Sequence, residues 1–109
     1  MILGLDVSSS ITGVTILSGE GVILFCDHID TRNKNKYPTL LDKAKEIKSH
    51  LNKISKEYNI EEIYIEESLQ SFRSGFSSAK TLSTLSKING IVSYLCFEIF
   101  NTKPEYIGS

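Results

Sequence analysis

The first quarter of the chain alternates short apolar runs with breaks of small polar residues, a pattern typical of consecutive β-strands. Apolar runs cover residues 2–6, 13–17 and 22–26, and a turn with two glycines at residues 18–21 joins the second run to the third. Short strands joined by tight turns pair as antiparallel neighbours. We therefore predict three antiparallel strands at the start of the chain.

Two helices and two further strands are predicted in the remainder. Apolar residues recur every three or four positions over residues 38–58 and 78–100, which is the spacing of one helix face. Apolar runs at residues 63–65 and 104–107 predict the fourth and fifth strands. Strands joined through a helix favour parallel pairing with a right-handed crossover. The order β-β-β-α-β-α-β thus predicts an α/β fold with a mixed sheet and helices packed on the sheet.

Amino-acid composition excludes only a few classes of protein. The chain has 109 residues, of which 40% are hydrophobic and 23% charged, as expected for one globular domain over residues 1–109. No apolar stretch approaches the roughly 20 residues of a membrane span. Cys26 and Cys96 lack the spacing of a zinc site, so reduced thiols in the cytoplasm are expected. The net charge of -1 gives no global argument for binding nucleic acid.

Two carboxylates stand at the ends of predicted apolar strands. Asp6 ends the first run and Glu66 follows the fourth, and neither strand contains Lys or Arg. Ligands of open α/β sheets gather at the carboxyl ends of the strands. Two carboxylates there repel each other unless a cation lies between them, and Mg²⁺ (or Mn²⁺) takes oxygen ligands of this kind. The alternative is that each carboxylate accepts hydrogen bonds from loop amides and binds no metal.

Two segments resemble motifs of the RuvC-type Holliday-junction resolvases. Residues 3–13, Leu-Gly-Leu-Asp-Val-Ser-Ser-Ser-Ile-Thr-Gly, are similar to the first motif, in which an Asp precedes a turn of small residues. Residues 63–66, Ile-Tyr-Ile-Glu, are similar to the second motif, an apolar strand that delivers a Glu. The next helix, with Asn-Gly at 89–90, resembles the segment that packs the dimer in this family. The likeness covers nearly the whole chain.

The resemblance implies a ribonuclease H-like fold and a metal-dependent endonuclease that acts on branched DNA. Asp6 and Glu66 would be the catalytic and metal-binding residues, and helix 78–100 would form a homodimer. Glu67 is the alternative carboxylate, although strand alternation puts it on the opposite face from Glu66. A bacterial or bacteriophage origin fits the same resemblance.

The sequence departs from this family at its end. The family completes its site with an Asp pair or a His-Asp combination on a helix after the fifth strand, and the chain ends at Ser109 before such a helix. Four other carboxylates, Asp27, Asp30, Glu98 and Glu105, do not occupy the matching positions. We therefore expect this chain to be a fragment that cleaves branched DNA poorly or not at all.

Several polar and aromatic residues are candidate contacts to nucleic acid. They are Ser8, Ser9, Ser10, Thr12, Phe72, Arg73 and Lys80. Hydroxyl groups after Asp6 would bind phosphate, and Phe72 beside a cation would stack on an unpaired base. The alternatives are an ordinary turn and an ordinary packed loop. Basic residues at 32, 34 and 36 and along the first helix would contact phosphate, but a solvated surface predicts the same residues.

Three functions follow from these observations. The first is a structure-specific DNA endonuclease. The second is a nucleotide-binding half-domain of the actin and sugar-kinase type, because that class also opens with an acidic strand end and a Gly/Ser/Thr turn. The third is a non-catalytic relative that binds nucleic acid or assembles as a dimer.

Overall fold

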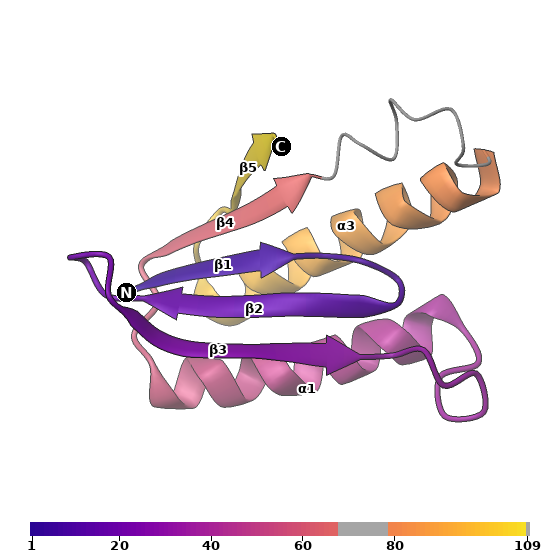
Figure 1. The fold of residues 1–109 in the computed structure, drawn as a ribbon, viewed down its shortest axis with the longest axis horizontal. Coiled ribbons are helices and arrows are strands. Elements are labelled where there is room, and N and C mark those ends of the chain that lie inside the picture. The colour runs from indigo at the N-terminus through magenta and orange to yellow at the C-terminus, as the bar shows by residue number, and fades with distance from the viewer. Residues whose placement is uncertain (68–78, 109) are drawn as a thin grey trace.

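A computed structural model describes residues 1–67 and 79–108, which form one mixed sheet and two helices (Figure 1). The strands are β1 (Ile2–Asp6), β2 (Ile11–Leu17), β3 (Ile23–Asp30), β4 (Glu62–Glu67) and β5 (Glu105–Gly108), and the helices are α1 (Leu40–Glu57) and α3 (Ala79–Phe100). This is the predicted order of elements. No helix in the described part of the chain is long and apolar enough to cross a membrane.

The sheet has the mixed pairing that the sequence predicts. Its strand order is β3-β2-β1-β4-β5. The first three strands pair as antiparallel neighbours, and β4 pairs in parallel with both β1 and β5. Both helices lie behind the sheet in Figure 1, so the face turned toward the viewer carries no helix. We call the face without helices the open face.

Alternating apolar residues hold the sheet against the two helices. Leu3 and Leu5 of β1 and Ile63 and Ile65 of β4 are at most 3% exposed. Their neighbours in the core come from both helices, Ala44, Ile47, Leu51 and Ile54 from α1 and Ile88, Val92 and Cys96 from α3. Successive strand residues point to opposite faces, so this pattern fixes which side chains of β1 and β4 lie on the open face.

Several boundaries differ from the predicted ones. Strand β3 continues to Asp30 instead of ending at Cys26, because its polar second half pairs with β2 at the edge of the sheet. An edge strand with one uncovered face can keep polar residues, which apolar patterning cannot detect. Helix α1 begins at Leu40 because Thr39 caps it, with the Thr39 side chain accepting a hydrogen bond from the N–H of Asp42. The predicted loop at 68–78 lies outside the described residues.

The two cysteines differ in exposure, which predicts different reactivity. Cys96 is fully buried, and this burial raises the pKa of its thiol to about 12, whereas Cys26 is exposed on β3. A thiol reacts as thiolate and only when accessible. We expect a thiol reagent to label one cysteine of the native protein and a second one after unfolding. Mass spectrometry should locate the native label at Cys26, and rapid native labelling of Cys96 would contradict the packing described here.

Candidate functional site

Asp6 and Glu66 lie side by side on the open face. They are Cα partners in the parallel pairing of β1 with β4. Leu5 and Ile65, one residue earlier in each strand, are buried under the helices, so alternation turns both carboxylates to the open face. Neighbouring strands are about 4.8 Å apart, which puts the two carboxylates within reach of one cation.

Little in the structure neutralises this pair of carboxylates. Within residues 1–67 and 79–108, no ion pair involves Asp6 or Glu66. The amides of the following turn do not serve them either, because the N–H groups of Ser8, Ser10 and Ile11 are bound within the turn itself. Two adjacent, unpaired carboxylates favour a bound cation.

The donor set fits a hard divalent ion. Two carboxylates supply oxygen ligands, which suit Mg²⁺ or Mn²⁺ better than zinc. The described residues contain no group of three or more acidic, His or Cys side chains that could hold an ion. Magnesium usually keeps several waters and binds through one or two carboxylates plus substrate phosphate. Asp6 and Glu66 therefore suit an open site that water and phosphate complete, and they do not form a closed protein cage.

The turn after Asp6 is held by its own side chains. Ser8 Oγ accepts hydrogen bonds from the N–H groups of Ser10 at 2.9 Å and Ile11 at 3.4 Å. Thr12 Oγ1 accepts from the Ser8 N–H at 3.4 Å and donates to the Ser8 carbonyl at 3.2 Å. Thr12 is 1% exposed, so its hydroxyl supports the turn from the interior and does not face solvent.

Two residues far along the chain brace the same turn. Thr31 Oγ1 donates to the carbonyls of Ser9 at 3.4 Å and Ser10 at 3.1 Å, and the Thr31 N–H donates to the Ser10 carbonyl at 2.8 Å. From α1, Lys43 Nζ donates to the Ser9 carbonyl. The sequence does not predict this role for Lys43, because a lysine at this position is equally expected on a helix face exposed to solvent. The brace fixes the segment that carries Asp6.

Removal of the Thr31 hydroxyl should loosen this brace. Thr31 is 1% exposed, and Thr31→Val removes its hydroxyl from the Ser9 and Ser10 carbonyls, which keep Lys43 Nζ and the Thr31 N–H as donors, so the free energy of unfolding should fall by about 1 kcal/mol. Urea denaturation measures the change. Thr15→Val is the matched control, because within residues 1–67 and 79–108 the Thr15 Oγ1 atom approaches only the Cys26 sulfur, at 4.0 Å, so this substitution should change stability by less than about 0.5 kcal/mol. Equal effects of the two substitutions would argue against the brace.

The other predicted contact residues are spread over the chain. Ser9 is half-buried and Ser10 is exposed on the braced turn, and Lys80 is exposed in the first turn of α3. Phe72 and Arg73 lie outside the described residues. The backbone of Glu67 ends β4, and the side chain of this alternative carboxylate also lies outside what the structure describes.

The sequence did not predict the ion pair between Asp30 and Arg32 at the end of β3. Arg32 donates from Nε to Asp30 Oδ1 at 3.0 Å and from Nη2 to Asp30 Oδ2 at 2.7 Å. These hydrogen bonds from Arg32 lower the pKa of Asp30 to about 2. The pair lies between the apolar run of residues 22–26 and the helix predicted from residue 38, where apolar patterning predicts no contact.

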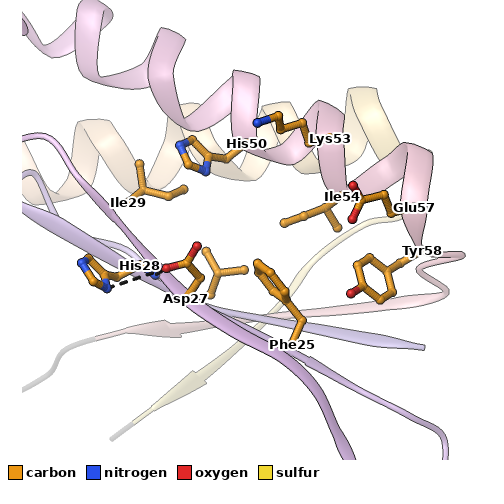
Figure 2. A pocket seen from close by; sticks show the side chains of 10 residues that line it. Phe25, Asp27, His28, Ile29, His50, Lys53, Ile54, Glu57 and Tyr58 are labelled. Carbon is orange, nitrogen blue, oxygen red and sulfur yellow. Dashed lines mark hydrogen bonds and ion pairs between the residues drawn. The ribbon is translucent and has the colours of Figure 1, made fainter.

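A hollow of about 260 Å³ lies between β3 and α1, on the helix-covered side of the sheet (Figure 2). Its walls mix apolar and charged side chains: Val14, Phe25, Asp27, His28, Ile29, His50, Lys53, Ile54, Glu57 and Tyr58. Figure 2 shows Asp27 turned toward α1. Asp27 pairs with the buried Val14, so its side chain lies on the face opposite Asp6. The hollow is therefore separate from the carboxylate pair.

Comparison with solved structures identifies the class of fold. A Thermus thermophilus RuvC in complex with a Holliday-junction substrate superimposes with a TM-score of 0.77 at 14% identity, over 98% of this chain and 63% of that one. A second Thermus thermophilus RuvC structure gives 0.66 at 15% identity, over 98% and 60%. The chain thus has a RuvC-like, ribonuclease H-like fold and spans about three-fifths of the RuvC chains it matches.

The same core also occurs in a protein with a different description. An exopolyphosphatase-like protein superimposes with a TM-score of 0.54 at 10% identity, over 97% of this chain and 31% of that one. No family model matches the sequence, and no curated protein is similar to it in sequence. The fold is therefore shown, and the chemistry has to be argued from the site.

Proposed function

We propose that this chain carries part of the active site of a metal-dependent, structure-specific DNA endonuclease of the RuvC type. The observation that carries the proposal is the parallel register in which Asp6 and Glu66 are Cα partners on the open face. In this proposal both residues bind Mg²⁺ or Mn²⁺ and both are catalytic. The RuvC-like fold supports the nuclease class.

The residues of the chain would contribute fixed geometry to phosphodiester hydrolysis. A divalent ion bound there would neutralise charge on the scissile phosphate and activate a water molecule. Asp6 is held by the β-ladder and by the braced turn, and Glu66 is held by its pairing with β1 and β5. Rigid placement of ligands lowers the cost of positioning in the reaction. Attack by water would leave a 5′-phosphate, as the resemblance implies.

Branched DNA is the proposed substrate. One of the similar RuvC structures is a complex with a Holliday junction, and we extend that class of ligand to this chain. Ser9, Ser10 and Lys80 remain the proposed contacts among the described residues, while Ser8 and Thr12, also predicted as contacts, would act by shaping the turn. Phe72 and Arg73 remain proposed contacts to an unpaired base.

The proposed dimer surface is an apolar groove between α3 and the start of α1. Leu41 is 72% exposed and Tyr94 is 60% exposed there. The groove has a volume of about 790 Å³ and is lined by Thr39, Leu40, Leu41, Ser86, Lys87, Gly90, Ile91 and Tyr94. A Cβ on Gly90 would meet nothing within 4 Å, so this position leaves room for a partner helix.

The dimer is tested by a charge placed in the groove. Gly90→Glu has space within its own chain, so it should shift sedimentation from dimer to monomer without loss of folding. Ser49→Glu, at an exposed position of α1, is the control and should leave the dimer intact. A wild-type protein that sediments as a monomer at all concentrations would refute the dimer.

The endonuclease is tested with a four-way DNA junction and a linear duplex of the same sequence. We expect the protein to bind the junction more tightly and to cleave it slowly or not at all in Mg²⁺, because no third acidic, His or Cys ligand joins Asp6 and Glu66 among the described residues. Any cleavage should disappear in Asp6→Asn. Equal affinity for junction and duplex would refute structure specificity, and robust cleavage lost in Asp6→Asn would refute our expectation of an incomplete site.

A nucleotide-binding half-domain is the alternative, and the shared core with an exopolyphosphatase-like protein favours testing it. Phosphate cradles of that kind offer free backbone N–H groups. Here the amides of Ser8, Ser10 and Ile11 are bound inside the turn. Binding of ATP with Mg²⁺, tighter than binding of the junction, would overturn the nuclease proposal in favour of this one.

A further inference from the structure

The segment between β3 and α1 lies at the same end of the sheet as Asp6 and Glu66. Figure 1 shows this loop at the end toward which β1 and β4 point. Asp30, the last residue of β3, is the Cα partner of Ile11 in β2. Thr31 then binds the carbonyls of the turn that follows Asp6. The loop is therefore attached directly to the carboxylate site.

A shallow, open hollow of about 570 Å³ lies against this loop. It is lined by Asp30, Arg32, Asn33, Lys36 and Tyr37. Two of these side chains are cations and one is a carboxylate. Arg32 already holds that carboxylate with two hydrogen bonds, so the Lys36 charge is not offset by it. The hollow thus presents positive charge beside a site that carries two negative charges.

The backbone of the loop is pre-formed. Asn33 Oδ1 accepts hydrogen bonds from the N–H groups of Asn35 at 2.9 Å and Lys36 at 3.2 Å. The Tyr37 N–H donates to the Asn33 carbonyl at 2.8 Å, and the Tyr37 side chain is 8% exposed and anchors the loop. Such a loop needs little ordering when a ligand binds.

Arg32 is oriented for a second partner. Asp30 engages its Nε and Nη2 atoms. A guanidinium has five N–H donors, so further donors remain for an anion, and paired N–H groups match the oxygens of a phosphate. The Arg32 side chain is 64% exposed, so a ligand can reach it.

We propose that this hollow binds a backbone phosphate through Arg32 and Lys36, on the same DNA strand whose scissile phosphate is held at Asp6 and Glu66. The inference rests on the proposed nuclease function and adds the subsite that guides the strand. His28 is level with Asp6 across β2, and Asp30 lies two residues further along β3, so the hollow is more than about 10 Å from Asp6 and binds a different phosphate from the scissile one. The cations offset the repulsion between DNA and the carboxylates.

The test is the salt dependence of binding to a fluorescein-labelled four-way DNA junction, followed by fluorescence anisotropy in Mg²⁺. Loss of the contacts to this one phosphate in the Arg32→Gln/Lys36→Gln variant should lower affinity about tenfold and reduce the slope of log K against log salt by roughly 1. Lys53→Gln/Lys56→Gln is the control with the same change in charge. Lys53 lies about 20 Å along α1 from its start, so this control should keep the wild-type slope. Arg32→Lys/Lys36→Arg should also keep it.

The measured salt slopes show whether Arg32 and Lys36 bind phosphate. A wild-type slope in Arg32→Gln/Lys36→Gln, or an equal loss in Lys53→Gln/Lys56→Gln, overturns the subsite. If that happens while the wild-type protein binds the junction and Mn²⁺ still stabilises it through Asp6 and Glu66, the nuclease proposal stands alone. A wild-type protein that binds no junction overturns both.

Discussion

Asp6→Asn should abolish the rise in melting temperature that Mn²⁺ produces in the wild-type protein. A ligand at about 100 times its Kd stabilises the folded state by about 2.7 kcal/mol, which corresponds to roughly 10 °C for a domain of this size. The variant loses one of two ligands, so this shift should vanish. Without metal the variant should melt slightly above wild type, because the repulsion between Asp6 and Glu66 is gone.

Differential scanning calorimetry with and without Mn²⁺ measures both effects. Glu66→Gln should behave like Asp6→Asn, since the two residues are Cα partners. Glu105→Gln is the matched control, an exposed carboxylate on β5 of the same sheet, and should keep the full shift. A full Mn²⁺ shift in Asp6→Asn would mean that the metal binds elsewhere.

Ile65→Ala should be the most destabilising single truncation near the site. Ile65 is 0% exposed in the interior strand β4 and packs in the core beneath the helices. Truncation of such a residue leaves a cavity and costs about 2–5 kcal/mol, a large part of the 5–15 kcal/mol that stabilises a typical domain. Urea denaturation followed by circular dichroism measures the loss.

Ile23→Ala is the control for this truncation. Ile23 is 64% exposed on β3, and its substitution should change the free energy of unfolding by less than about 1 kcal/mol. Because Ile65 precedes Glu66, the truncation should also weaken Mn²⁺ stabilisation. If Ile65→Ala unfolds at the same urea concentration as wild type, β4 does not form the core described here.

The two carboxylates of the site could be predicted because each is marked by the apolar strand residues directly before it. Each acidic residue directly follows an apolar run, and the burial of Leu5 and Ile65 leaves the next side chain in each strand on the opposite face. The helix between β3 and β4 favours strands that run in the same direction, but it does not select β1 as the neighbour of β4, which the structure shows. Residue type and parity therefore predicted the two carboxylates and their faces, and the tertiary pairing of β1 with β4 brought them together.

The brace could not be predicted because it depends on contacts between distant segments, and for the basic hollow the sequence offered residues 32 and 36 as phosphate contacts without their place beside the turn after Asp6. Thr31 and Lys43 meet the turn at Ser9 across 22 and 34 residues of chain. Both are polar residues in polar stretches of the sequence, so nothing in their pattern distinguishes them from residues that face solvent. The polar end of β3 has no apolar pattern, so the predicted strand ended at residue 26, before Asp30 and Arg32. Tertiary pairing, which no local pattern records, placed them beside the site.

The most direct test of the account is a crystal structure of the protein soaked in Mn²⁺, with the ion located by its anomalous scattering. We expect one peak between the carboxylates of residues 6 and 66, at about 2.2 Å from an oxygen of each. The same peak should be absent from crystals of Asp6→Asn, because Asp6 supplies one of the two ligands. A peak bound by only one of the two carboxylates, or no peak on this face of the sheet, would contradict the shared metal site.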